Sequence, residues 1–164
     1  MLNNRLKVLL ELQRQGIDYQ LYEHPPTPTI EDAIKHWGKM DATHCKNLFF
    51  RNHKGNQHFL VIFKHLQQLA IKDLEAKLKQ GKLSFASEKR MAKYLGTKPG
   101  SVSLFGLIND TTKHVYVFLD KKLLNSQFLS FHPNDNTASL KVSKDDFLKF
   151  LKTSGNNYEF LDLY

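Results

Sequence analysis

The chain has 164 residues, 41% of them hydrophobic and 24% charged, a balance that is ordinary for one globular domain with a buried core. No apolar run approaches the ~20 residues of a bilayer-spanning helix, and the first residues lack the apolar core of a secretory signal, which excludes a membrane-spanning protein and predicts a cytoplasmic domain over residues 1–164. The single cysteine excludes an internal disulfide framework, and the net charge of +8 favours polyanionic partners such as RNA, although scattered surface lysines would give the same charge.

The first third of the chain predicts two helices and a short strand. Leucines at helical spacing predict a helix over 2–13 that ends at Gly16, and residues 17–22 alternate like a strand. Prolines interrupt regular structure over residues 24–29. Thr29 is then placed to cap a helix over 30–37, whose first turn is acidic.

The middle of the chain predicts a β-hairpin followed by two helices. Residues 46–51 and 57–63 are rich in aromatic and β-branched residues, and the loop between them contains Gly55. Leucines between 69 and 78 indicate a helix that ends near Gly81. A shorter helix over 87–94 follows, and residues 100–106 have the composition of a loop.

The last third predicts three strands, a helix and a final strand. Residues 114–119 form the first strand, and the strands 127–131 and 137–142 flank a turn. Ser143 with Asp146 resembles a capping box for a helix that ends at Gly155, before a strand over 158–161. Helices and strands interleave, yet several strand pairs are joined by tight turns. We therefore expect an α/β fold with a mixed, mainly antiparallel sheet surrounded by helices.

Several catalytic motifs are absent from the sequence. There is no G-x-x-x-x-G-K-S/T phosphate loop, no G-x-G-x-x-G dinucleotide turn, no G-x-S-x-G nucleophile elbow and no H-E-x-x-H zinc motif. The eight histidines are dispersed and lack partners at metal-ligand spacing, so no metal site is expected.

Four polar segments at the ends of predicted elements remain as candidates: 24–29, 44–47, 98–102 and 131–137. Lys46 opens an apolar strand and is either an exposed strand-end charge or a cation at the mouth of a pocket. His24 and His132 are either turn residues or functional groups. Cys45 fits a small buried hydrophobe better than a nucleophile, because Cys45 and His44, as neighbours on an extended chain, point to opposite faces. The segment around Gly100 could expose backbone N–H groups to an oxyanion.

Six blocks, spread in order over nearly the whole chain, resemble the YbaK/ProX family of tRNA editing deacylases, which are relatives of the editing domain of prolyl-tRNA synthetase. The blocks are Tyr22-Glu23-His24-Pro25-Pro26, His44-Cys45-Lys46-Asn47-Leu48-Phe49, Leu83-Ser84-Phe85-Ala86-Ser87, Lys98-Pro99-Gly100-Ser101-Val102-Ser103, Gly106-Leu107-Ile108-Asn109-Asp110, and Phe131-His132-Pro133 with Asn136-Thr137-Ala138. The chain most resembles the alanyl-tRNA(Pro) deacylases of this family.

The resemblance implies a hydrolase that removes a wrong amino acid from tRNA(Pro) by water attack, with help from the 2′-hydroxyl of the terminal adenosine and without metal, cofactor or covalent nucleophile. It implies that Lys46 anchors the acylated adenosine, that the N–H groups of Gly100 and Ser101 face the ester carbonyl, and that His132 lies beside the amino acid. From the same loop segments we take four further substrate-binding candidates: Thr27, Asn47, Phe131 and Asn136.

The partners implied are mischarged tRNA(Pro) and, as a candidate, prolyl-tRNA synthetase. Alternatives are a cysteinyl-tRNA(Pro) deacylase and a non-catalytic module that senses an amino acid or an aminoacyl-tRNA. Apolar pocket walls could come from Phe49, Phe105, Leu107 and Phe131, or these residues could be ordinary core. Two positions depart from the family pattern: Leu104 stands where the glycine loop usually has proline, and Cys45 stands where threonine is common.

Overall fold

The fold is known from a computed structural model that describes residues 3–26 and 40–164, and it confirms the expected mixed α/β class. Thr27 and the helix predicted over 30–37 lie outside the described residues. The helices are α1 (Asn4–Arg14), α3 (Ile71–Leu78), α4 (Glu88–Leu95) and α5 (Lys144–Ser154), with two 3-10 helices, η1 (Leu104–Asn109) and η2 (Lys121–Asn125). The strands are β1 (Gln20–Glu23), β2 (Thr43–Asn52), β3 (His58–Lys64), β4 (Leu83–Phe85), β5 (Tyr116–Asp120), β6 (Phe128–Phe131), β7 (Ala138–Ser143) and β8 (Tyr158–Leu161).

The described strands form one sheet in the order β1-β7-β6-β2-β3-β5-β8, with β4 paired to β2. Both predicted turns join antiparallel neighbours, β2 with β3 and β6 with β7. The contacts of β2 with β6, of β3 with β5 and of β5 with β8 are parallel. In the described part of the chain, antiparallel pairs therefore outnumber parallel pairs by only four to three. Parallel neighbours are far apart in sequence, so no turn signal announces them.

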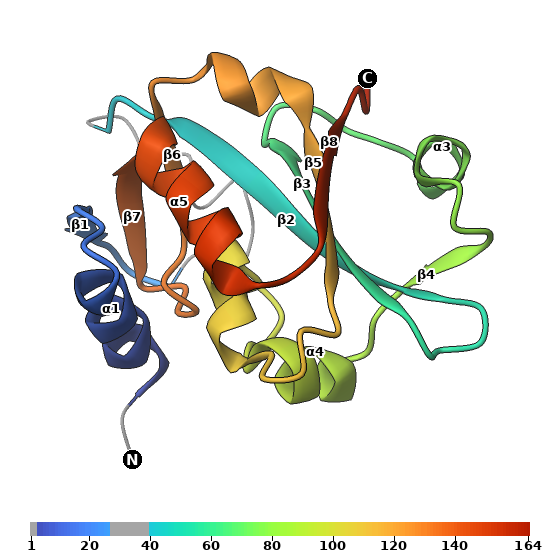
Figure 1. Cartoon of the computed structure of the whole chain (residues 1–164), viewed down its shortest axis with the longest axis horizontal. Helices are drawn as coiled ribbons and strands as arrows, with labels where there is room; N and C mark the ends of the chain where they lie inside the picture. Colours follow the sequence, from blue (N-terminus) through green and yellow to red (C-terminus); the bar gives the residue numbers. More distant parts are fainter. Residues whose placement is uncertain (1–2, 27–39) are drawn as a thin grey trace.

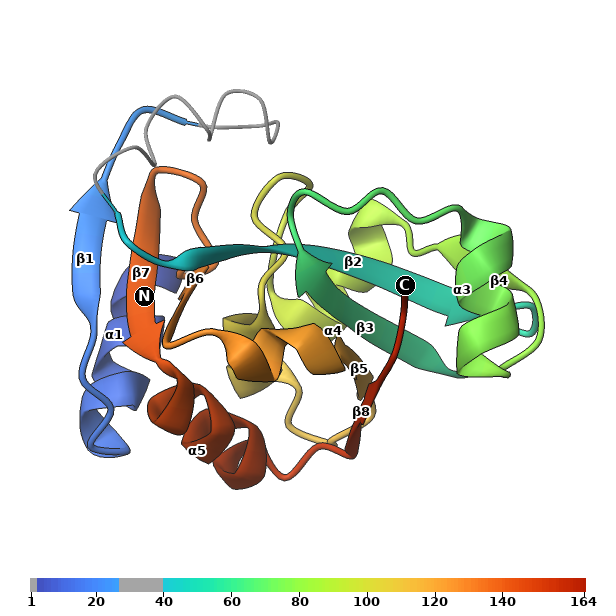
Figure 2. The ribbon, with the colours of Figure 1, turned by 90° about the horizontal axis from the view of Figure 1, so that it is seen from above.

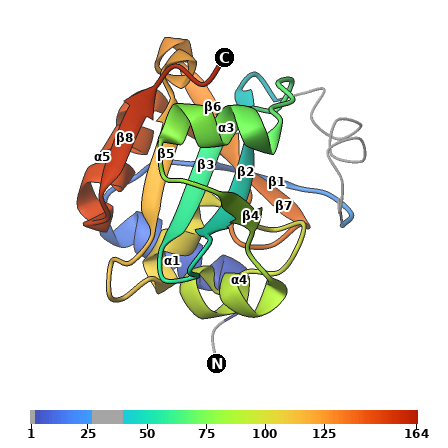
Figure 3. The same cartoon turned by 90° about the vertical axis from the view of Figure 1, so that its right-hand side faces the viewer.

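Two hydrophobic cores lie on opposite faces of the central strands. Alternation along β2 and β3 sends Phe49, Leu60 and Ile62 to one core and Phe50 and Val61 to the other. The larger core is covered by α1, α4, η1 and α5, whereas α3 packs on the opposite face (Figures 1 and 3). Viewed from above, α1 and α5 lie on the same side of the sheet, close to β7 (Figure 2). The long β2 crosses the whole molecule and links the two halves of the sheet.

Most predicted helix ends are confirmed, and three elements were not predicted. The side chains of Ser87 and Ser143 accept hydrogen bonds from the N–H groups of Arg90 and Asp146 at the starts of α4 and α5. The segment 100–106, expected to be a loop, contains the start of η1, while β4 and η2 are too short to give a periodic signal. Within the described residues, no helix is both long and apolar enough to cross a membrane.

Candidate active site

Lys46 lies in the middle of β2 on the face that carries His44 and Leu48. Its half-buried side chain is opposite Phe63 of β3, with the ammonium nitrogen 5.9 Å from the centre of the ring. Lys46 therefore lies on a central strand of the sheet, next to an aromatic side chain, and not at an exposed strand end. Such a cation is less hydrated than one in open solvent and is suited to hold an anionic or ester oxygen.

Three histidines from three different strands or strand ends gather beside β2, and we call His24, His44 and His132 the site histidines. The rings of His24 and His132 have their centres 6.0 Å apart in an edge-to-face arrangement. His44 pairs in register with Ser130 of β6, two residues before His132, so strand alternation puts His44 and His132 on one face. Lys46 shares that face of β2. The fold thus brings together His132 and Lys46, two of the residues predicted to bind substrate.

Hydrogen bonds define the orientation of the His132 ring. Its Nδ1 lies 2.7 Å from the carbonyl oxygen of Ala138, so Nδ1 carries the proton and donates. Nε2 is then an acceptor, and it has no hydrogen-bond partner among the residues that the structure describes. His24 contacts Ser139 through its Nε2, with 3.1 Å to the hydroxyl. A neutral His132 therefore presents a lone pair to the surroundings of the site.

Burial lowers the pKa of His44 and of His132 and so keeps these two rings neutral. Desolvation, with the nearby His65 and His132 as smaller causes, lowers the pKa of His44 to about 4. Desolvation also lowers the pKa of His132, and its hydrogen bond to Ala138 opposes this shift only in part. At neutral pH these rings are hydrogen-bond donors and acceptors rather than cations, which leaves the charge of this face of β2 to Lys46.

Residues Lys98 to Ser101 form a tight turn shortly before η1, and its geometry corrects one expectation. Pro99 and Gly100 occupy the central positions, with Gly100 at φ +86, and the Ser101 N–H donates to the Lys98 carbonyl at 3.0 Å. This is the pattern of a type II turn, in which the third residue needs a positive φ. The Ser101 N–H, which we expected to face an ester carbonyl, is therefore used inside the turn. The Gly100 N–H has no acceptor within the described residues.

Asn47 connects β2 to the end of this turn. Its side-chain oxygen accepts a hydrogen bond of 3.1 Å from the backbone N–H of Leu104, at the start of η1. A proline at position 104, as in the usual family pattern, could not donate this bond. Leu104 is also fully buried in the larger core. A hydrogen bond and apolar packing thus fix the end of the glycine turn at position 104, where the usual family pattern has proline.

The remaining predicted residues divide into core and turn. Phe131 is 2% exposed, and its ring stacks on Phe147 and meets Phe105 edge-on. The four candidate pocket walls all belong to the larger core: Phe49, Phe105, Leu107 and Phe131. Asn136 is half-buried in the turn between β6 and β7. Phe131 therefore contributes to the site by placing His132, the next residue.

Cys45 has the environment of a structural thiol. It packs against the larger core, on the opposite face of β2 from His44 and Lys46, and burial raises its pKa well above the usual value. A thiol that stays protonated at neutral pH is a poor nucleophile. In the described part of the chain, no group of three or more histidine, cysteine or acidic residues could hold a metal ion.

Comparison with known proteins gives the family of the chain. Residues 24–150 match the family model described as "Aminoacyl-tRNA editing domain". The chain belongs to this family. It is 41% identical over 95% of both chains to "Prolyl-tRNA editing protein ProX" of Acetoanaerobium sticklandii, and 33% identical over 96% of both chains to "Prolyl-tRNA synthetase associated domain-containing protein 1" of Mus musculus.

A solved structure shows the same fold at low sequence identity. "Crystal structure of a putative trans-editing enzyme for prolyl tRNA synthetase" superposes with a TM-score of 0.74 over 99% of this chain and 98% of the other, at 20% identity. The editing-domain family and the fold agree, so the chain is an aminoacyl-tRNA deacylase, a hydrolase of the ester between an amino acid and tRNA.

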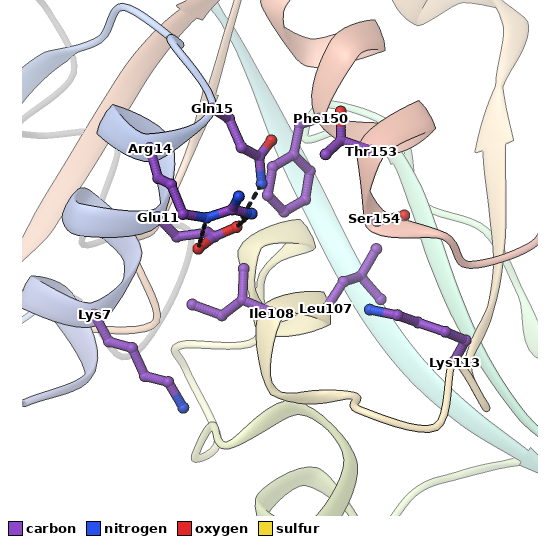
Figure 4. Close-up of a pocket in the computed structure, with 10 residues that line it drawn as sticks. All are labelled: Lys7, Glu11, Arg14, Gln15, Leu107, Ile108, Lys113, Phe150, Thr153 and Ser154. Atoms are coloured by element: carbon purple, nitrogen blue, oxygen red, sulfur yellow. Dashed lines mark hydrogen bonds and ion pairs between the residues drawn. The ribbon is translucent and has the colours of Figure 1, made fainter.

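A pocket of the editing domain lies between α1, η1 and α5 (Figure 4). Its volume is about 200 Å³. The Glu11 carboxylate accepts hydrogen bonds from Arg14 and Gln15, and the Lys7 ammonium bonds the side-chain oxygen of Asn109. Arg14 also stands in the last turn of α1, where a cation balances the helix dipole. The charges of Lys7, Glu11 and Arg14 are engaged within the protein. Of the residues predicted for the active site, only the candidate wall residue Leu107 is among those that line this pocket: Lys7, Glu11, Arg14, Gln15, Leu107, Ile108, Lys113, Phe150, Thr153 and Ser154.

The site also depends on residues that the sequence did not single out. Arg5 of α1 contacts Glu23, Asp135 and Thr137, and the last two belong to the turn that follows His132. Arg5 and Thr137 are 132 positions apart in the chain. No local pattern connects residues at such a separation, so only the fold could reveal the contact.

Proposed function

We propose that this deacylase acts on mischarged tRNA(Pro) and that alanine is the amino acid that it removes. The observation that carries the proposal is the 41% identity, over 95% of both chains, to a protein named for prolyl-tRNA editing. The net charge of +8 fits a tRNA partner. The half-buried cation of Lys46, beside neutral histidines, suits the acylated end of such a molecule.

The roles that we propose follow from the contacts of each residue. Lys46 holds the acylated terminal nucleotide by its charge. The N–H of Gly100, in the Pro99–Gly100 turn, donates to the oxygen of the ester carbonyl as it becomes an oxyanion. The acceptor Nε2 of His132 lies beside the amino acid, where it can receive a hydrogen bond from the substrate's amino group. Asn47 keeps the turn in place through Leu104.

The chemical step needs no nucleophile from the protein. Water attacks the ester carbonyl carbon, and the bond to the 3′-oxygen of the adenosine breaks as the tetrahedral intermediate collapses. We assign the proton transfer from water to the departing 3′-oxygen to the neighbouring 2′-hydroxyl. The enzyme then supplies orientation and a stabilised oxyanion, and the loss of one such donor typically costs ~10²–10³ in rate.

Editing of alanine has a physical reason. A synthetase pocket built for proline rejects the smaller alanine weakly, because each missing methylene is worth only ~1–3 kcal/mol. A second site that excludes proline by size restores accuracy. Cysteine is also small enough to be a competing substrate, so the distinction between alanine and cysteine belongs in the test.

The decisive experiment is a deacylation panel with Ala-tRNA(Pro), Cys-tRNA(Pro) and Pro-tRNA(Pro). We expect rapid loss of alanine, slower loss of cysteine and none of proline. Preferred cleavage of Cys-tRNA(Pro) would replace alanine by cysteine as the substrate, and tight binding of all three without cleavage would support a sensing module instead.

The same panel tests Lys46. We expect Lys46→Ala to lower kcat/KM by about 100-fold or more with little change in melting temperature, since it removes a charge that contacts the substrate. Lys152→Ala, on the exposed face of α5, is the matched control and should keep full activity. A large loss of stability in Lys46→Ala with unchanged kcat/KM would show that the lysine serves the sheet.

A further inference from the structure

Arg5, on the first turn of α1, ties together three segments that are distant in sequence. Its guanidinium lies 2.9 Å from the Glu23 carboxylate of β1 and 3.4 Å from the Asp135 carboxylate, and it donates to the hydroxyl of Thr137. We propose that Arg5 is a positioning residue for His132: it fixes the turn that orients the ring. The inference rests on the proposed function, in which His132 lies beside the amino acid.

Thr137 is the centre of the contacts that reach the site histidines. Its N–H and its hydroxyl both donate to one oxygen of Asp135, at 2.8 and 2.6 Å, while the hydroxyl accepts from Arg5. The Thr137 carbonyl accepts the backbone N–H of His24 at 3.0 Å. The next carbonyl along the chain, that of Ala138, is the acceptor for Nδ1 of His132. One turn thus sets the positions of two site histidines.

The charge of Arg5 holds this turn together because Asp135 is ionised. Burial opposes ionisation, but hydrogen bonds from Thr137 and the neighbouring Arg5 lower the pKa of Asp135 below its usual value. The side chains of Arg5 and Asp135 are 21% and 31% exposed, whereas Glu23 is 70% exposed. An exposed ion pair contributes little. The contacts to Asp135 and Thr137 therefore carry the effect, and the contact to Glu23 is secondary.

The geometry requires arginine rather than any cation. Three acceptors, one on β1 and two in the turn between β6 and β7, are reached by three different nitrogens of one planar group: Nη1, Nε and Nη2. A lysine has a single ammonium and cannot reach three fixed acceptors with the same geometry. Substitution by lysine should restore the attraction to Asp135 without restoring the orientation of the turn.

The test compares Arg5→Met, Arg5→Lys and a matched control, Arg14→Met. Arg14 is the other arginine of α1, with a 68% exposed side chain that pairs with Glu11. With Ala-tRNA(Pro) we expect kcat to fall about tenfold in Arg5→Met, with a smaller change in KM, because a displaced ring misaligns bound substrate. Arg5→Lys should lie between wild type and Arg5→Met, and Arg14→Met should equal wild type.

Nitrogen NMR of the His132 ring gives a second readout, the tautomer of the ring. If Arg5 only stabilised the fold, its substitution would not change this tautomer. Wild type should show one tautomer, protonated at Nδ1, and Arg5→Met a mixture of both. A lower melting temperature with an unchanged tautomer and unchanged kcat would overturn the proposal and leave Arg5 as a tether for α1. If wild type fails to deacylate any substrate, the proposed function fails, and the NMR result still decides the role of Arg5.

A second variant covers the case in which Arg5→Met does not fold. Thr137→Val keeps the shape of the side chain but removes the hydroxyl between Arg5 and Asp135. The proposal expects the same mixture of tautomers in this variant. A single Nδ1-protonated tautomer in Thr137→Val would contradict it.

Discussion

Two groups of histidines lie on either side of β2, and one residue of each, His58 and His132, differ in how many ring nitrogens are hydrogen-bonded within the described residues. At the second group, His58 of β3 uses both: Nε2 accepts from Arg90 at 2.8 Å and Nδ1 donates to His114 at 2.8 Å. Its ring is 1% exposed and lies against Phe49 and Tyr94. At the candidate site, Nδ1 is the only ring nitrogen of His132 with a hydrogen-bond partner among the described residues.

The comparison separates a structural histidine from one with unused binding capacity. Burial lowers the pKa in both groups, to about 4 for His58 and for His44. The shift in pKa therefore does not distinguish the two roles. The acceptor nitrogen Nε2 of His132, which lacks a hydrogen-bond partner in the part of the chain that the structure describes, does distinguish them, because a group whose hydrogen bonds are complete cannot bind a substrate through them.

The largest effect that we expect is a loss of stability in acid. For His44 and His58 the folded pKa is about 4 and the unfolded value about 6.5. Between these values the unfolded chain binds protons that the folded chain excludes, so the free energy of unfolding is highest above pH 6.5 and falls as the pH drops towards 4. At 1.36 kcal/mol per unit of pKa, each histidine contributes about 3 kcal/mol.

Urea unfolding at pH 7.5, 5.5 and 4.5 measures this loss. His58→Gln should flatten the pH dependence by about half, since one of the two histidines is then absent. Equal pH dependence in wild type and His58→Gln would show that His58 does not control acid stability.

The next effect is the cost of removing His58 itself. His58→Ala leaves a cavity between Phe49 and Tyr94 and deprives Arg90 and His114 of a partner, so we expect a loss of roughly 2–4 kcal/mol in the free energy of unfolding. Activity per folded molecule should stay within about twofold of wild type. His53→Ala, in the exposed hairpin loop, is the control. A selective loss of activity in His58→Ala would erase the distinction between the two groups.

His132 should show the reverse pattern. His132→Asn keeps an N–H near Nδ1 that can still donate to Ala138, but it lacks Nε2. Loss of one hydrogen bond to the substrate, worth about 1–3 kcal/mol, predicts a fall in kcat/KM of roughly 10- to 100-fold. The melting temperature should change little. Steady-state kinetics with thermal unfolding checks both, and wild-type kcat/KM in this variant would remove Nε2 from the proposed site.

The smallest effect is expected for Cys45, between the site residues in sequence but on the opposite face of β2. Cys45→Ala should leave kcat/KM within about twofold of wild type. Thiol-blocking reagents should leave the activity of the wild-type protein unchanged as well, because the thiol takes no part in the chemistry. Inactivation by Cys45→Ala at unchanged stability would bring thiol catalysis back.

The sequence predicted the two hairpins of the sheet and a set of candidate residues for the site. The resemblance identified Lys46 and His132 from local blocks, and the fold places both beside the same face of β2. It did not foresee that the Ser101 N–H is used within its own turn, although Pro99–Gly100 is a type II signal that could have shown it. Nor did it predict that the backbone N–H of Leu104, at a position where the usual family pattern has proline, donates a hydrogen bond to Asn47.

The sequence by itself determined the features that depend on residues close together in the chain. These are the α/β class, the two hairpins, the helix caps at Ser87 and Ser143, and the separation of Cys45 from Lys46 by strand alternation. Only the tertiary structure decided the parallel strand pairs, the hydrogen bond of His132 to Ala138 through Nδ1, the use of both ring nitrogens of His58, and the contact of Arg5 with Thr137. Most of these contacts join residues far apart in the chain, and their geometry depends on the packing of whole elements rather than on any local pattern.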